Sequence, residues 1–179
     1  MKQAGTTLLE LMVVLAIAAI LLAIGIPSFA SLTTSSRLAN ATNSMVASLH
    51  LARSEAIKRN SRTVLCPSAS GTACAASGGW QQGWLVFHDI NNNAALDAGE
   101  TLILSQSGMP DGFRLTGNSS VADYISYAPT GAAEKTSGAF QAGTLTVCRQ
   151  SYEEYGARLI VISRTGRPRT AKTTLASCP

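Results

Sequence analysis

The first pattern along the chain is a long apolar run near its start. No charged or polar side chain occurs from Leu11 to Ile26, and Leu8 and Leu9 extend the run backward past Glu10. The run from Leu8 to Ile26 is long enough for a membrane-spanning helix, which needs about 20 residues. Because Lys2 precedes the run and the next basic residue is Arg37, we expect the N-terminus to face the cytoplasm. A secretory signal peptide is disfavoured, because a carboxylate inside an apolar segment marks a functional site.

A second apolar pattern follows Pro27 and recurs at steps of three and four residues, the period of a helix with one apolar face. We expect a helix from Ser28 to about Arg59, continuing the apolar segment of residues 6–27, so that residues 28–60 form its amphipathic half. The stripe consists of Leu38, Thr42, Met45 with Val46, Leu49, Ala52 with Arg53, and Ala56 with Ile57.

Beyond Asn60 the pattern changes to short apolar or alternating runs separated by Gly, Pro, Asn and Ser. Such punctuation predicts an antiparallel arrangement of strands, with the helix packed on one face of the sheet. The fold class is therefore α+β, with residues 61–179 as a β-rich head. The expected strands are Arg62–Cys66, Trp84–His88, Thr101–Gln106, Phe113–Thr116, Tyr124–Tyr127, Thr144–Arg149 and Ala157–Ser163.

Composition narrows the functional classes. Only 13% of the 179 residues are charged, where about 25% is typical, and the formal net charge is +4. The chain has no Walker motif, no G-x-G-x-x-G and no H-E-x-x-H. His50 and His88 have no spacing that suggests a metal pair or a catalytic triad. We therefore expect a protein that is not an enzyme and needs no cofactor.

The positive charge gathers at the C-terminal end, where five basic and no acidic side chains follow Ala157. Pro168 separates two guanidinium groups and makes a central strand unlikely there. Basic side chains on an exposed segment suit contacts to nucleic-acid phosphates, but they are also compatible with a merely solvated tail. The candidate DNA-binding residues are Arg164, Gly166, Arg167, Arg169 and Lys172.

Four cysteines allow three pairings, and a head outside the cytoplasmic membrane would lie where disulfides persist. We favour Cys66 with Cys74 and Cys148 with Cys178, because each bond closes a segment that is otherwise poorly anchored. A zinc site is the rival reading, but the spacings lack the paired C-x2-4-C form.

An Asn- and Asp-rich segment lies between two expected strands. Its oxygen-bearing residues have the spacing of an EF-hand calcium loop: Asp89, Asn91, Asn93, Asp97 and Glu100. Ala94 replaces the glycine that makes the sharp turn in such loops, and strands rather than helices flank the segment. We favour a plain turn that joins two strands, with calcium as the alternative.

The segment Ala4–Val14, with Gly5 before Thr6 and Glu10 at the fifth position after the glycine, resembles the type III signal of type IV pilins and type II secretion pseudopilins. The resemblance implies that a prepilin peptidase removes residues 1–5 and that Thr6 becomes the N-methylated terminus. It also implies that Glu10 pairs with the terminal amine of a neighbouring subunit, which gives a buried carboxylate its cationic partner. The family usually has Phe where this chain has Thr6.

Further segments are similar to the GspH/FimT family of minor pilins and pseudopilins: Leu51–Arg59, Trp84–Asp89, Ile125–Gly131 and Thr165–Arg169. The resemblance implies a helical stalk with a small β-rich head in a pilus or pseudopilus filament. The chain would be a single-pass inner-membrane protein with its head in the periplasm before assembly. Its partners would be other major and minor pilins or pseudopilins, the prepilin peptidase and the inner-membrane assembly platform.

The segment Gly166-Arg167-Pro168-Arg169 looks like the Gly-Arg-x-Arg motif of FimT-type minor pilins, which contributes to DNA binding in natural transformation. This implies sequence-independent binding of extracellular double-stranded DNA for uptake through a type IV pilus. The alternative is a structural subunit without DNA binding, either a GspH-like pseudopilin of type II secretion or a minor pilin that primes pilus assembly. We favour the first, because Arg169 and the flanking basic residues add to the motif.

Overall fold

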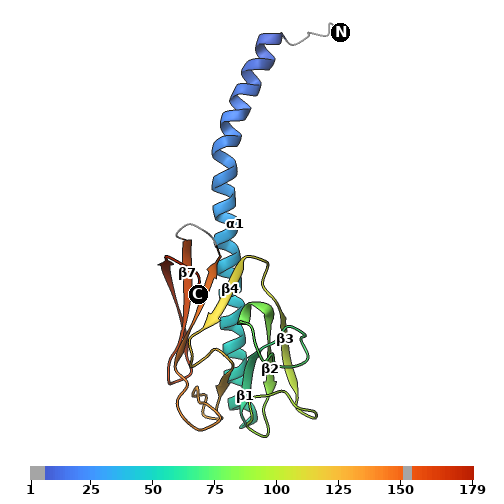
Figure 1. Ribbon diagram of the computed structural model, residues 1–179, viewed down its shortest axis with the longest axis vertical. Helices are drawn as coiled ribbons and strands as arrows, with labels where there is room; N and C mark the ends of the chain where they lie inside the picture. Colours follow the sequence, from blue (N-terminus) through green and yellow to red (C-terminus); the bar gives the residue numbers. More distant parts are fainter. Residues whose placement is uncertain (1–6, 151–154) are drawn as a thin grey trace. The chain divides into compact units, whose positions relative to one another are not determined.

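A computed structural model describes residues 7–150 and 155–179 (Figure 1). Gly5 and Thr6, the expected cleavage and methylation positions, lie outside the described residues. The chain divides into two compact units, residues 1–37 and 38–179.

One helix, α1 (Leu8–Arg59), runs without interruption through Pro27. Its start is capped by Thr7, whose Oγ1 accepts a hydrogen bond from the backbone N–H of Glu10 at 3.3 Å. Thr7 and Glu10 have the spacing of a capping box, which satisfies donors that have no partner in the first turn. Within the first unit, Leu8–Ile26 is long and apolar enough to cross a membrane.

The second unit contains the C-terminal half of α1, which buries one stripe of side chains. Leu38, Thr42, Met45, Leu49, Ala52 and Ala56 are buried. Their steps of three and four residues confirm the expected stripe, with Ala52 and Ala56 rather than Arg53 and Ile57 at its centre. Ser48 lies beside the stripe and accepts a hydrogen bond from the indole N–H of Trp84 at 2.9 Å.

Two antiparallel four-stranded sheets complete this unit. The first has the order β3-β2-β1-β5, and the second has the order β4-β6-β7-β8. The first sheet consists of β1 (Thr63–Pro67), β2 (Gly83–His88), β3 (Leu102–Ser107) and β5 (Ile125–Tyr127), and the short 3-10 helix η1 (Trp80–Gln82) precedes β2. The second sheet consists of β4 (Phe113–Gly117), β6 (Gly143–Arg149), β7 (Tyr155–Ile162) and β8 (Pro168–Leu175).

The main core lies between α1 and both sheets. Met45 and Leu49 of the helix share one buried cluster with Leu65 of the first sheet and with Leu145 and Ile160 of the second. Figure 1 shows the C-terminal half of α1 with a sheet on either side of it. Burying such side chains fully contributes about 1.5–3 kcal/mol each, which fixes the helix against both sheets.

Two expectations need correction. The seven expected strands are present, but they form two sheets, and an eighth strand, β8, extends the second one. The segment from Pro168 pairs along its whole length with β7, from Ile162↔Pro168 to Tyr155↔Leu175. Pro168 is tolerated because it occupies the first position of an edge strand, where it interrupts no ladder on its outer side.

Candidate nucleic-acid interface

The candidate DNA-binding residues lie on one β-hairpin, formed by β7 and β8. Its loop is Arg164, Thr165 and Gly166, held by a hydrogen bond from Gly166 N–H to the Ser163 carbonyl at 2.9 Å. Gly166 has a φ of 74°, the left-handed conformation that Gly adopts at little cost. A three-residue hairpin loop that ends in a left-handed Gly is a common way to join two strands. The basic segment is therefore an ordered hairpin rather than a free tail.

Gly166 is also buried against a second turn. A Cβ atom at this position would overlap the carbonyl oxygen of Gly131, and it would lie 3.0 Å from the ring of Tyr127. Gly131, with a φ of 78°, is itself closely approached by the side chain of Ile57. The absence of a side chain at Gly166 thus allows the hairpin loop to pack against the turn at Gly131.

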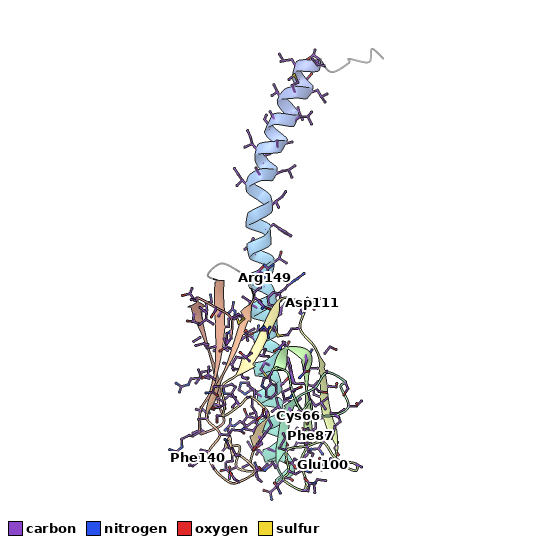
Figure 2. The ribbon with its side chains drawn as sticks, viewed as in Figure 1. Cys66, Phe87, Glu100, Asp111, Phe140 and Arg149 are labelled. Carbon is purple, nitrogen blue, oxygen red and sulfur yellow. A yellow bond between two sulfur atoms is a disulfide. The ribbon has the colours of Figure 1, made fainter. Side chains whose placement is uncertain are left out.

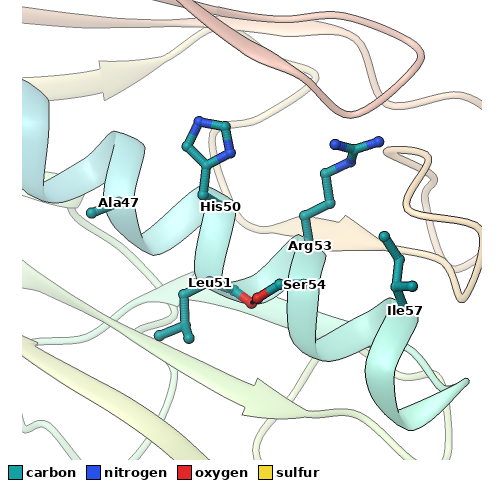
Figure 3. Close-up of a pocket in the computed structure, with 6 residues that line it drawn as sticks. All are labelled: Ala47, His50, Leu51, Arg53, Ser54 and Ile57. Carbon is teal, nitrogen blue, oxygen red and sulfur yellow. Dashed lines mark hydrogen bonds between the residues drawn. The ribbon is translucent and has the colours of Figure 1, made fainter.

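Helix α1 reaches the same place through Arg53. Its Nε donates a hydrogen bond to the carbonyl oxygen of Gly131 at 2.9 Å, so one carbonyl faces both Arg53 and Gly166. Figure 3 shows Arg53 and His50 projecting to the same side of the helix. Both side chains border a shallow groove along α1. The groove is lined by Ala47, His50, Leu51, Arg53, Ser54 and Ile57. The helix therefore helps to hold the hairpin loop in place.

The pleat of the hairpin separates the basic side chains of β8. Arg169 pairs with Val161, whereas Lys172 pairs with Arg158. Arg158 shares its face of β7 with Ile160, which is buried in the core, so Lys172 lies on the core-facing side and Arg169 on the outer side. Because β8 is the edge strand and both side chains are exposed, the two still border the same open edge.

Burial and charge explain the state of Tyr127 beside this loop. Burial raises the pKa of the Tyr127 hydroxyl, and the positive charge of Arg53 opposes that rise. Within the described residues, the hydroxyl oxygen has no hydrogen-bond partner. The tyrosine is thus a neutral, buried support for Gly166.

Phe140 is a residue of this region that sequence reasoning missed. The guanidinium carbon of Arg164 lies 3.9 Å from the centre of the Phe140 ring. Figure 2 shows Phe140 and Arg149 at opposite ends of the second unit. No local pattern marks Phe140, because its partner comes from a distant hairpin loop.

Several other basic side chains of the second unit have protein partners. Arg59 forms an ion pair with Glu55 at 2.6 Å, and Lys58 contacts the same carboxylate at 3.6 Å. Arg62 donates hydrogen bonds to Asn92, Ser126 and the carbonyl of Glu134. Arg167, Arg169 and Lys172, in contrast, form no side-chain hydrogen bond or ion pair with any residue that the structure describes. These three cations therefore face solvent with their charge uncompensated by a contact.

The structure contains the two disulfides that the sequence favoured, Cys66–Cys74 and Cys148–Cys178. Cys148 belongs to β6 and Cys178 follows β8, with β7 between the two strands. The segment after β8 is thus tied back across the sheet. Ala157 of β7 is buried although it shares a face with the exposed Val161.

The Asn- and Asp-rich segment joins β2 to β3 and uses its carboxylates in hydrogen bonds within the loop. Both oxygens of the buried Asp89 accept backbone N–H groups, from Asn93 and Ala94 at 3.1 Å each. Asp97 accepts the side-chain amides of Asn91 and Asn93, which hold the pKa of Asp97 below its ordinary value. Glu100 accepts the backbone N–H groups of Ile90 and Asp97 at 2.8 and 3.1 Å. Over the described part of the chain, no three His, Cys, Asp or Glu side chains are grouped to hold a metal ion.

Comparison with known families decides which family this arrangement represents. The family described as type II transport protein GspH matches residues 41–166, well over half of the chain. The chain belongs to the GspH family. A second match, to the prokaryotic N-terminal methylation motif, covers residues 1–26 of this GspH-family protein. No curated protein matches it.

Solved structures with the same fold are also pilins or pseudopilins. The type IV minor pilin FimU of Pseudomonas aeruginosa (strain PAO1) superimposes with a TM-score of 0.61 at 17% identity, covering 83% of this chain and 99% of that one. The minor pseudopilin EpsH from the type II secretion system of Vibrio cholerae gives 0.52 at 12% identity, covering 75% of this chain and 96% of that one. At these identities the likeness shows the fold, which is that of a type IV pilin with a long N-terminal helix and a β-rich head.

Together these matches identify the GspH-family chain as a minor pilin or pseudopilin of a type IV pilus or a type II secretion system. The expectation that it is not an enzyme agrees with the family, whose structural neighbours are filament subunits. The apolar helix and the pilin motif indicate a membrane-anchored subunit that enters a pilus or pseudopilus. Its partners are accordingly other pilins and the assembly machinery.

Proposed function

We propose that this GspH-family protein is a minor pilin of a type IV pilus that binds extracellular double-stranded DNA, without sequence preference, for uptake in natural transformation. The observation that carries the proposal is the open edge of β8. Arg167, Arg169 and Lys172 border this edge, and none has an acidic partner among the described residues.

The geometry of the edge suits a nucleic-acid backbone. Lys172 follows Arg167 by five residues of extended chain, a span of roughly 16 Å at the usual rise per residue. Arg169 on the outer side and Lys172 on the core-facing side flank the edge, so a duplex that lies along β8 would meet both. Arg164 and Arg167 add charge at the loop end. Contacts of this kind bind phosphates and carry no sequence information.

The remaining sequence-based assignments belong to the same proposal. Cleavage after Gly5 and methylation of Thr6 would free the N-terminus of the apolar helix, and Glu10 would pair with the terminal amine of a neighbour in the filament. The N-terminus faces the cytoplasm and the head lies in the periplasm before assembly, where disulfides such as Cys148–Cys178 persist.

A structural subunit without DNA binding is the second candidate. The specific observation in its favour is that the matched family is described as a type II transport protein, and that the pseudopilin EpsH shares the fold. In that case the basic edge would contact an acidic partner or solvent only.

DNA binding by the full chain in detergent micelles separates the two candidates. Two duplexes of unrelated sequence should bind with equal affinity, and log K should fall linearly with log salt concentration. The double variant R167A/R169A should reduce that slope by about two. The matched control is Arg114→Ala, because Arg114 lies on β4, the opposite edge of the same sheet. No binding by the parent chain, or equal binding by R167A/R169A, would leave only the structural role.

A further inference from the structure

We propose that Phe140 is a positioning residue for DNA binding: its ring holds the guanidinium of Arg164 in place at the hairpin loop, ready for a phosphate. This inference rests on the proposed function, and it names a residue that the basic motif does not contain. The contact that carries it places the guanidinium carbon of Arg164 over the Phe140 ring, 3.9 Å from the ring centre.

Phe140 lies in an ordered segment, although the residue is 54% exposed. The next residue, Gln141, is fully buried, and its side chain forms three hydrogen bonds. It accepts the N–H of Ser126 at 2.8 Å and donates to the carbonyls of Tyr124 and Ser120 at 2.7 and 3.1 Å. On the other side, a tight turn joins Lys135 to Ala139. The backbone at Phe140 is thus fixed from both directions, so the position from which its exposed ring projects is well defined.

Arg164 approaches this surface from a loop that is fixed by other contacts. Its neighbour Ser163 is tied to Gly166 and to Arg167 by backbone hydrogen bonds. A cation over an aromatic face is attracted by the negative charge of that face. Such a contact uses the charge of the guanidinium and engages none of its N–H groups with an oxygen acceptor. The contact therefore orders a long side chain without consuming its donors, which lowers the entropy lost when a phosphate binds.

The charges around the pair are compatible with an anionic ligand. Glu134 is the cross-strand neighbour of Phe140, and its backbone carbonyl accepts a hydrogen bond from Arg62. Within the described residues, no ion pair joins the Glu134 carboxylate to Arg164. Lys135 lies next to Glu134 and adds positive charge at the same turn. Arg164 is therefore held by a ring rather than neutralised by a carboxylate, which keeps its full charge available.

The test is a double-variant cycle on the full chain in detergent, with a 30-base-pair duplex and the corresponding single strand as probes. Phe140→Ala should weaken duplex binding about two- to five-fold, the strength of an exposed cation–π contact. In the Arg164→Ala background the same substitution should have no further effect. Phe140→Tyr should bind like the parent chain, and Phe140→Leu, which keeps the apolar surface without a ring, should bind like Phe140→Ala.

A measurement without DNA keeps the two proposals apart. The side-chain NMR signals of Arg164 should show an upfield ring-current shift that Phe140→Ala removes. The positioning role would be overturned if Phe140→Ala weakened DNA binding equally in the parent chain and in the Arg164→Ala variant. It would also be overturned if Phe140→Leu bound DNA like the parent chain. A larger loss for the single strand that persists without Arg164 would also overturn it and would assign the ring to base stacking. If R167A/R169A loses DNA binding but Phe140→Ala binds DNA like the parent chain, only this inference is wrong. If the parent chain does not bind DNA at all, the proposed function is wrong.

Discussion

The backbone of Gly166 lies against the carbonyl oxygen of Gly131 so closely that no side chain fits between them. The same carbonyl accepts a hydrogen bond from Arg53 of α1. The hairpin loop that bears Arg164, with Arg167 directly after it, is thereby joined to the helix through one turn. This contact holds the loop against the helix, in addition to the hydrogen bonds within the hairpin itself.

The first prediction follows from that contact. Gly166→Ala should lower the free energy of unfolding by about 2–5 kcal/mol, because it adds overlap with Gly131 to the strain of a positive φ. Gly99→Ala is the matched control, since Gly99 also has a positive φ but open space around it. It should cost only about 1–2 kcal/mol. Urea denaturation of both variants measures the difference, and equal losses would show that the contact with Gly131 contributes nothing.

Tyr127 supports the second prediction. Its ring lies beside Gly166, but its buried hydroxyl has no hydrogen-bond partner within the described part of the chain. Tyr127→Phe should therefore raise the free energy of unfolding by about 1 kcal/mol, because an unsatisfied buried hydroxyl is removed while the ring stays. Tyr127→Ala should lower it by about 3–5 kcal/mol through the cavity that remains. Thermal denaturation checks both, and a destabilised Tyr127→Phe variant would reveal a hydrogen bond in solution.

The pleat of β8 gives the third prediction. A duplex along the strand edge should contact Arg169 and Lys172, although they lie on opposite faces of the sheet. Each alanine substitution should then lower the salt slope of DNA binding by about one. If the duplex lies instead on the outer face alone, Lys172→Ala will keep the parent slope. Salt titrations of the two single variants, with Arg114→Ala as the control, decide between these orientations.

Much of the fold could be predicted because its signals are local. The stripe from Leu38 to Ala56 follows from helical period alone. The strands β1 to β7 follow from short apolar or alternating runs, and β1 and β2 are apolar along most of their length because both of their faces are buried. Strand β8 gives no such signal, because Arg169 and Lys172 are exposed on either side of an edge strand. The division into two sheets depends on pairing between distant strands, such as β1 with β5.

The candidate site, like the fold, has one part that the sequence predicts and another part that depends on tertiary contacts. The basic residues were visible in the sequence as a cluster with no acidic neighbour. The support beneath them was not, because Phe140 and Gly131 meet the hairpin loop only through the tertiary fold. The motif predicts a role for Gly166 in DNA binding, and its close approach to Gly131 adds a packing requirement at the same position.

The fourth prediction concerns the loop between β2 and β3. The side-chain amides of Asn91 and Asn93 lower the pKa of Asp97, so these hydrogen bonds stabilise the folded state above the unfolded Asp pKa of about 3.9. The stabilisation should be lost as the pH falls through the lower folded pKa. In the double variant N91A/N93A, an NMR titration should show the Asp97 pKa raised toward its ordinary value. The difference in melting temperature between parent and variant should be smaller near pH 2 than at pH 6. Part of it should remain, because the Asn91 and Asn93 side chains also accept the backbone N–H groups of Asn93 and Ala95. An unchanged Asp97 pKa in the variant would contradict this cause.

The fifth prediction separates stability from binding at the C-terminus. The Cys148–Cys178 bond closes a sequence separation of 30 residues, and its loss should cost about 3–4 kcal/mol in the chain-entropy model. The Cys66–Cys74 bond closes only 8 residues, so its loss should cost about 2–3 kcal/mol. DNA affinity of the folded C148S/C178S variant should nevertheless stay within about two-fold of the parent chain, because the ladder from Ile162↔Pro168 to Tyr155↔Leu175 still fixes β8 against β7. Urea denaturation of C148S/C178S and of C66S/C74S measures the loss of stability, and DNA titration of the same two variants measures the affinity. A large loss of affinity in C148S/C178S alone would show that the disulfide, rather than strand pairing, presents Arg169 and Lys172.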